Sequence, residues 1–310
     1  MKTKYLGMLT VMAMLSLTAC NNKEDLPQAA EGMPICFQVT TGDMQSRASH
    51  ANANTIDQFG LRIKSKTEGV TYPDKNLTFT GSGEANPKVW TPNENIAWQT
   101  NPHKVDIIAY YPIDLHNDIE SPFESNTFIN IEENQTIDSY KSDVMTAKIS
   151  DLDPSTLSAG EVVNLSFQHL MSQLQVVITL PTKASTEKID GICIGGTMRL
   201  CWLNRTTNEC YDFNNIGNVN VNQAEQTGNS VTFKCILIPQ TVTAGKLTVS
   251  FIYDGNYYEW VSDQDFTLKQ NTIQTLNLEV KDASAAQTQS MQSRSWGGHT
   301  AYEVISNSMN

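Results

Sequence analysis

Residues Val163–Val176 carry the sequence VNLSFQHLMSQLQV, and this stretch decides the fold. Val163, Leu165 and Phe167 alternate with short polar residues, which is the period-two pattern of a strand with one buried face. A second apolar run begins at Leu174, beyond a bend near His169. The stretch therefore predicts two strands in close succession.

The same alternation recurs along the chain, bounded by Gly, Pro, Asn and Asp, whereas helical stripes longer than about three turns are absent. We therefore predict an all-β protein built from short antiparallel strands. The expected strands are residues 34–40, 59–64, 105–111, 161–167, 174–180, 196–203, 231–238, 247–253, 257–261 and 273–280.

Strands of this kind bury their apolar faces most simply in β-sandwiches, because an isolated sheet leaves one apolar face in water. A chain of 310 residues has room for two such domains. The clearest break between strands is Pro181–Ser185. We expect an N-terminal sandwich over residues 48–182 and a C-terminal sandwich over residues 183–281, in tandem.

The first twenty residues have the composition of a signal peptide. Lys2 and Lys4 precede an apolar run from Tyr5 to Leu17, which is shorter than the about 20 residues of a membrane-spanning helix. The following Leu17-Thr18-Ala19-Cys20 resembles a bacterial lipobox, which implies lipidation (palmitate) of Cys20. An ordinary secretory signal with an incidental Cys20 is the alternative, and it too exports the chain.

Residues 21–32 are polar and predict a tether after the signal peptide. Within them, Lys23-Glu24-Asp25 resembles a tag that directs lipoproteins to the outer face of the outer membrane. We therefore expect the protein at the cell outer membrane, exposed at the surface and held there by its lipid.

Composition excludes several classes of function. The net charge is −12, from 21 basic and 33 acidic residues without a Lys/Arg cluster, so no nucleic-acid partner is expected. The chain lacks G-x-S-x-G, H-E-x-x-H, P-loop and G-x-G-x-x-G patterns. We expect no enzyme, no catalytic residue, no metal site and no cofactor.

Five cysteines follow Cys20 without a C-x-x-C pair, so we expect no structural zinc site. They are Cys36, Cys193, Cys201, Cys210 and Cys235. Some of the last four could pair in an oxidising compartment, although strand contexts favour buried free thiols. We expect at most one or two disulfides. His169 is interpreted as a hydrogen-bonded structural residue, because no catalytic partner stands at a recognisable spacing from it.

Three stretches resemble the fimbrillins, the subunits of protease-assembled adhesive bacterial pili. The first is Trp98 followed by Val105–Pro112, and the second joins Asp143–Ala147 to the opening stretch Val163–Val176. The third joins Ile238-Pro239-Gln240, Gly245-Lys246-Leu247, Phe251–Gly255 and Trp260. The resemblance implies two transthyretin-like β-sandwiches and a subunit of a fimbria that mediates cell adhesion and associates with other fimbrial subunits.

The resemblance gives residues 21–47 a second role, as a tether followed by a removable first strand. Ile35, Phe37 and Val39 alternate with polar neighbours, and Arg47-Ala48 follows shortly after. In fimbrillins an arginine-specific protease cuts at such a bond. A sandwich that lacks one central strand can then accept a strand from another subunit by β-augmentation. The alternative is that Arg47 is an ordinary arginine in a surface loop.

Residues 282–310 form a C-terminal tail and a possible donor strand. A polar linker over residues 282–292 is expected to lead to Ala301–Ile305, whose Tyr302 and Val304 would enter the pockets of a neighbour. The tail departs from the family pattern, which leaves stalk, tip, accessory and anchor roles open. The alternative functions are a membrane anchor subunit and a monomeric surface lipoprotein that binds a glycan or another ligand on a host or bacterial surface.

Overall fold

The computed structural model describes residues 32–41, 56–73, 76–82, 88–100, 103–113, 126–135, 140–181, 189–222, 224–280, 288–295, 298–300 and 306–307. Within these ranges the regular elements are strands, apart from the 3-10 turns η2 (Tyr140–Ser142) and η3 (Pro154–Thr156). The all-β prediction is confirmed. None of these residues forms a helix that could span a membrane.

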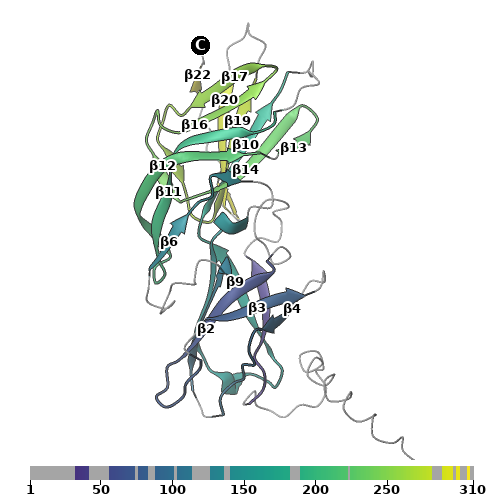
Figure 1. Cartoon of the computed structure of the whole chain (residues 1–310), viewed down its shortest axis with the longest axis vertical. Coiled ribbons are helices and arrows are strands. Elements are labelled where there is room, and N and C mark those ends of the chain that lie inside the picture. Colours follow the sequence, from purple (N-terminus) through teal and green to yellow (C-terminus); the bar gives the residue numbers. More distant parts are fainter. Residues whose placement is uncertain are drawn as a thin grey trace, which may run out of the picture.

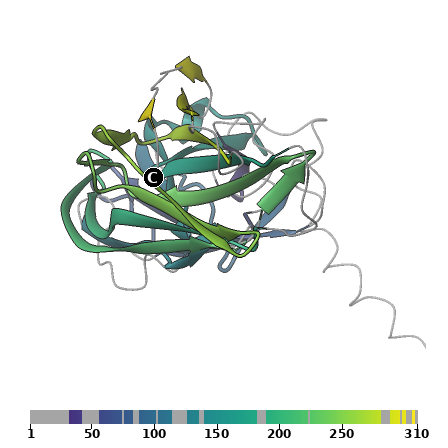
Figure 2. The same ribbon diagram turned by 90° about the horizontal axis from the view of Figure 1, so that it is seen from above.

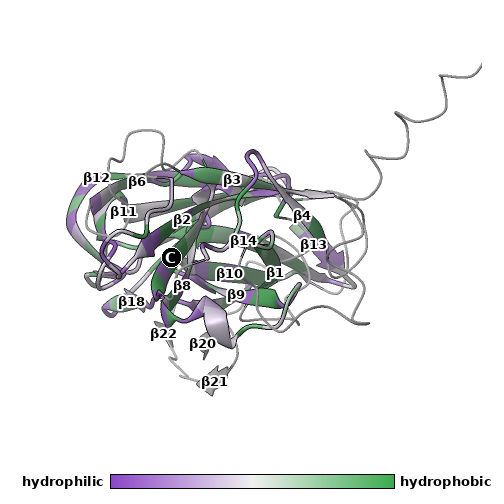
Figure 3. Ribbon diagram, turned by 90° about the horizontal axis from the view of Figure 1, so that it is seen from below, coloured by the Kyte–Doolittle hydropathy of each residue, from purple (hydrophilic) through white to green (hydrophobic). Residues whose placement is uncertain are grey.

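The described strands form two halves that lie end to end along the long axis of the molecule (Figure 1). Figure 2 looks along that axis, so that the halves overlap. Each half encloses its own cluster of buried apolar residues. Coloured by hydropathy in Figure 3, many strands show alternating bands, as expected for sheets with one buried face.

The N-terminal half contains one seven-stranded sheet that bends into two layers. The larger layer consists, in order, of β8 (Met145–Leu152), β5 (Val105–Tyr111), β2 (Gln58–Ser65), β3 (Leu77–Ser82) and β4 (Val89–Pro92). The second layer consists of β9 (Val162–His169) and β1 (Cys36–Thr41). Two residue pairs at the ends of β8 and β9 join the layers, and the core between them includes the fully buried Phe59, Phe79 and Phe167.

The C-terminal half is a sandwich of two sheets. The first runs β13 (Ala224–Thr227), β14 (Ser230–Leu237), β10 (Ser172–Thr179), β19 (Thr272–Glu279), β20 (Thr288–Ser295) and β21 (Gly298–Thr300), with β22 (Ser306–Asn307) also on β20. The second runs β17 (Asn256–Val261), β16 (Thr248–Tyr253), β11 (Ile192–Asn204), β12 (Glu209–Val221) and β7 (Asn134–Gln135), with β6 (Asn126–Asn130) also on β11. A small pair is formed by β15 (Gln240–Val242) and β18 (Phe266–Leu268).

The chain passes between the halves at the stretch that decided the fold. Its first strand, β9, belongs to the N-terminal half, and its second, β10, pairs with β14 and β19 of the C-terminal half. The change of half therefore falls near Leu170, ahead of the boundary expected at residues 182/183. The strands β6 and β7 also cross over and join the C-terminal half.

All ten expected strands are present, with ends that differ by a few residues. The most prominent strand that the sequence analysis did not predict is β12, whose first eight residues are mostly exposed and include as many apolar as polar side chains. Apolar alternation cannot reveal a strand that buries little of either face. Its hydrogen bonds to β11 position it instead.

Candidate assembly site around the first strand

The first strand inserts every second side chain into the N-terminal core. Ile35, Phe37 and Val39 are each no more than 6% exposed, while Cys36, Gln38 and Thr40 face outward and are half-buried. This is the alternation expected from the sequence, so the predicted strand is present with the predicted face inward. Its apolar face closes one side of the core.

β1 is held by a parallel ladder to β9, in which Cys36 pairs with Val162 and Thr41 with Phe167. Thr40 Oγ1 adds a hydrogen bond of 3.3 Å to Asn164 Oδ1. On its other side the chain before β1 meets the segment that leads to β5. The Ile35 amide donates to the Ile96 carbonyl at 3.0 Å, and the Trp98 amide donates to the Met33 carbonyl at 3.0 Å.

The position of β1 in its ladder differs from the prediction of a central strand. β1 lies at the end of the sheet order, with β9 as its neighbouring strand. It is nevertheless one of the two strands of the second layer, because β8 and β9 diverge after two residue pairs. Removing an edge strand in this place would open the core as well as the backbone of β9.

Phe37 anchors β1 in a group of aromatic rings. Its ring meets Phe79 edge-on at a centroid distance of 5.1 Å, and Phe79 stacks on Phe59 at 5.1 Å. Phe59 in turn contacts Trp90 at 4.9 Å and Phe167 at 5.7 Å. Rings in edge-to-face and stacked contact add to the stabilisation from burial. Phe37 thus packs into a cluster of aromatic rings in the N-terminal core.

Other predicted site residues lie outside the described residues. They are Cys20, Arg47, Ala48, Tyr302 and Val304. The Arg47–Ala48 bond falls between β1, which ends at Thr41, and β2, which begins at Gln58. A cut there would leave β1 attached to its half by non-covalent contacts alone.

The C-terminal tail contributes strands where a polar linker was expected over residues 282–292. β20 pairs antiparallel with β19, from Thr272 opposite Ser295 to Asn277 opposite Ser290. β21 and β22 both pair with β20. A polar sequence gave no strand signal, but β19 offers an open backbone edge that any chain can extend. The tail therefore covers an edge of its own C-terminal sheet.

His169 has the structural environment that its sequence context indicated. Its Nδ1 lies 2.9 Å from Asp143 Oδ1 and 3.0 Å from Oδ2, and both side chains are buried. Sequence spacing did not reveal Asp143 as its partner, because the two residues are 26 positions apart and meet only when β9 returns alongside β8.

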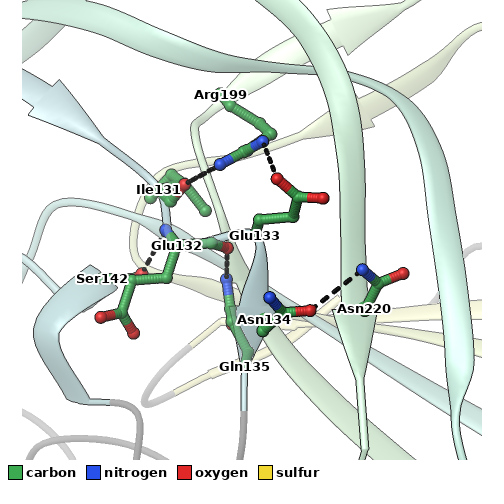
Figure 4. A network of polar contacts seen from close by, with 8 residues as sticks. All are labelled: Ile131, Glu132, Glu133, Asn134, Gln135, Ser142, Arg199 and Asn220. Carbon is green, nitrogen blue, oxygen red and sulfur yellow. Dashed lines mark hydrogen bonds and ion pairs between the residues drawn. The ribbon is translucent and has the colours of Figure 1, made fainter.

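The segment around β7 is anchored to both sheets of the C-terminal sandwich. Figure 4 shows Arg199 of β11 reaching the Ile131 carbonyl and the Glu133 carboxylate, at 3.2 Å in each case. The buried Gln135 side chain donates to the Ile236 carbonyl and accepts from the Ile236 amide, both at 2.8 Å. One glutamine amide thus replaces a missing backbone partner of β14.

The C-terminal cysteines Cys193, Cys201, Cys210 and Cys235 are free thiols, so none of the pairings considered from the sequence forms among them. Burial raises the pKa of Cys235 well above its ordinary value. Cys201 and Cys210 are hydrogen-bonded to each other, which raises the pKa of the first and lowers that of the second. The described residues contain no cluster of three or more metal-ligating side chains.

A family model described as fimbrillin-like matches residues 46–296, which is most of the chain. The chain belongs to the fimbrillin-like family. The match begins beside the Arg47–Ala48 bond and takes in both halves of the described structure. A search of the curated proteins found no match.

Solved structures share the fold of this fimbrillin-like chain. A proposed cell adhesion protein from Bacteroides ovatus aligns with a TM-score of 0.64 at 15% identity, over 86% of this chain and 98% of its own. A second proposed cell adhesion protein, from Bacteroides uniformis, gives 0.60 at 15% identity, over 85% and 98%. A fimbrial protein from Bacteroides vulgatus gives 0.53 at 14% identity, over 84% and 99%. At such identities the likeness establishes the fold, and it extends over both halves.

Proposed function

We propose that this chain is a structural and adhesive subunit of a bacterial fimbria, assembled with other subunits by proteolysis and donor-strand exchange. One observation carries the proposal. The first strand packs into an aromatic cluster of the core, and the Arg47–Ala48 peptide bond lies between this strand and the next one. Membership of the fimbrillin-like family supports a fimbrial rather than a catalytic role.

The proposed pathway begins with export and lipidation at Cys20. The lipid would hold the precursor at the outer membrane, exposed at the surface, with residues 21–32 as the tether. In this state β1 closes the core and blocks assembly. Residues 48–310 would be the assembling part, and the family match to residues 46–296 covers most of it.

Cleavage by an arginine-specific protease after Arg47 would then permit β1 to leave. Burial of Ile35, Phe37 and Val39 stabilises the precursor by roughly 1.5–3 kcal/mol for each side chain. After β1 leaves, β9 would present unpaired amides and carbonyls beside the pocket of Phe79 and Phe59. A strand from another subunit would restore both the ladder and the apolar contacts. The candidate donor is the tail with Tyr302 and Val304.

Pairing of the tail with β19 favours the second candidate function, a membrane anchor subunit or a monomeric surface lipoprotein. A tail that already covers its own sheet edge must detach before it can serve a neighbour. An anchor or monomer would keep Cys20 at its N-terminus and its tail in place. The two candidates therefore differ in the mature N-terminus.

The test is N-terminal sequencing of the protein purified from its native envelope, beside denaturing and non-denaturing gels. We expect Ala48 as the first residue, with laddered oligomers. An Arg47→Lys variant should keep Cys20 and stay monomeric, while Glu68→Gln, at an exposed position of the N-terminal half, should behave as the unsubstituted protein. A lipidated Cys20 on a lone monomer of the unsubstituted protein would contradict the assembly proposal and support the anchor or monomer.

A further inference from the structure

Three aromatic side chains form an exposed row across neighbouring strands of the C-terminal half. Phe128 of β6 pairs with Trp202 of β11, and Trp202 pairs with Tyr211 of β12. Residues directly opposite each other in a ladder point to the same side of the sheet. Because Cys201 and Leu203 on either side of Trp202 are buried, this row faces away from the core.

All three side chains of the row are exposed to solvent. Phe128, Trp202 and Tyr211 are 47%, 38% and 40% exposed, and the Phe128 and Trp202 rings meet edge-on with centroids 5.4 Å apart. Neighbouring strands lie about 4.8 Å apart, so the three rings extend over about 10 Å. Contiguous exposed apolar side chains with a polar rim mark binding sites.

Polar side chains occupy the next row of the same face. Asn126, Asn204 and Glu209 stand opposite one another on the same three strands. The side-chain oxygen Oδ1 of Asn204 accepts hydrogen bonds from the Thr206 and Thr207 backbone amides. The group that Asn204 can offer a ligand is therefore its side-chain NH2. A hollow of about 470 Å³ beside Tyr211 is lined by Asn204, Thr207, Glu209 and Gln270 among others.

We propose that this face binds a neutral oligosaccharide, with the rings of Phe128, Trp202 and Tyr211 stacked on the apolar C–H faces of the sugar units. Amide donors and the Glu209 carboxylate acceptor suit hydroxyl groups, which both donate and accept. None of these positions is basic, and the whole chain carries a net charge of −12, so an anionic glycan would lack a counter-charge.

The local backbone disfavours the other obvious occupant, a strand added to the edge of β12. The ladder between β11 and β12 shifts register between Trp202 and Leu200, and Asp212 adopts the left-handed region with φ 52°. A bulge of this kind disrupts regular pairing along an edge strand. The exposed ring row with its polar neighbours therefore fits a small hydroxylated ligand better than a protein strand. This inference goes beyond assembly, since the face lies on the opposite half from β1.

The experiment uses the full uncut precursor, so that its outcome does not depend on cleavage or polymerisation. The probe is an immobilised panel of neutral milk oligosaccharides together with their sialylated counterparts. We expect binding to neutral members and weaker binding to sialylated ones. Trp202→Ala should weaken binding about tenfold or more. Tyr257→Ala, which removes a 65%-exposed ring from β17 in the same sheet, should leave binding unchanged.

Acrylamide quenching of tryptophan fluorescence gives a second readout. Trp90, Trp98 and Trp260 are buried, whereas Trp202 is exposed, so a bound neutral oligosaccharide should reduce quenching in the unsubstituted protein and not in Trp202→Ala. No binding to any neutral glycan would overturn the inference, as would equal losses in Trp202→Ala and Tyr257→Ala. Impaired polymerisation of cut Trp202→Ala with no sugar binding by the unsubstituted precursor would assign the face to a neighbouring subunit instead.

Discussion

The side chains of His169 and Asp143 are in contact where the chain leaves the N-terminal half. The pair sits at the ends of β9 and β8, beside the residue pair Met145–His169 that joins the two layers. The backbone continues at once into Leu170, whose amide donates to the Val144 carbonyl at 2.7 Å. A buried carboxylate needs such a partner, because an unpaired charge in the interior is costly.

We predict that His169→Ala lowers the free energy of unfolding by about 3–5 kcal/mol, since it leaves the Asp143 carboxylate buried without its imidazole donor. Asp143→Asn combined with His169→Ala should cost less than the sum of the two single changes. Urea unfolding of the precursor measures both effects. Additive losses would contradict a direct interaction between the two side chains.

At the scale of the element, the two faces of β1 have different environments. Its inner face fills the pocket around Phe79, and its outer face carries half-buried polar residues. Its neighbour β9 is parallel, so β1 cannot be joined to β9 by a tight hairpin and is supplied by a distant part of the chain. This separation in sequence is what makes β1 replaceable by another chain in the proposed mechanism.

The two faces of β1 should respond differently to truncation. We predict that Phe37→Ala destabilises the uncut precursor by about 3 kcal/mol or more, because it leaves a cavity among the aromatic rings. Gln38→Ala, on the outer face of the same strand, should cost less than about 0.5 kcal/mol. Urea unfolding in an Arg47→Lys background, which prevents cleavage in the proposed pathway, measures the difference. Equal losses of stability in Phe37→Ala and Gln38→Ala would contradict the burial of Phe37 in the core.

On the scale of the whole molecule, the turn between β11 and β12 joins the two halves. Lys148 of β8 donates to the Arg205 carbonyl and, at 2.9 Å, to Asn208 Oδ1. Arg205 lies 5.5 Å from the centre of the Tyr110 ring of β5 and donates to Thr127 of β6. Burial, followed by the nearby Arg205 guanidinium, lowers the pKa of Lys148. Burial also raises the pKa of Tyr110 to about 12, so its hydroxyl stays neutral.

Removing the Lys148 contacts should uncouple the halves. We predict that Lys148→Ala lowers stability by about 1.5–3 kcal/mol and broadens or splits the calorimetric unfolding transition, because hydrogen bonds from a charged donor across the junction are lost. Lys66→Ala is the matched control, since Lys66 pairs with Asp106 and Asp151 on the surface of the N-terminal half alone. Surface pairs contribute little. An unchanged single transition in Lys148→Ala would contradict the proposed coupling.

The sequence by itself determined the all-β class, the ten strands with clear alternation and the inward face of β1, because period-two burial is a local property of a strand. It could not indicate β12, which buries little of either face over its first eight residues, or β20, which is polar. Both strands are held by the backbone edges of neighbouring strands. From the sequence, the boundary between the halves was expected after β10, at residues 182/183. The two strands of Val163–Val176 have similar apolar patterns, so the sequence does not show that they belong to different halves.

Partners far apart in sequence were decided by the tertiary structure. It assigned β9 and β10 to different halves, brought Asp143 to His169 and carried β6 alongside β11. The aromatic row depends on that last pairing, since Phe128 and Trp202 are isolated aromatic residues in the sequence. Ladder register sets which side chains share a face, and register is fixed only when strands meet.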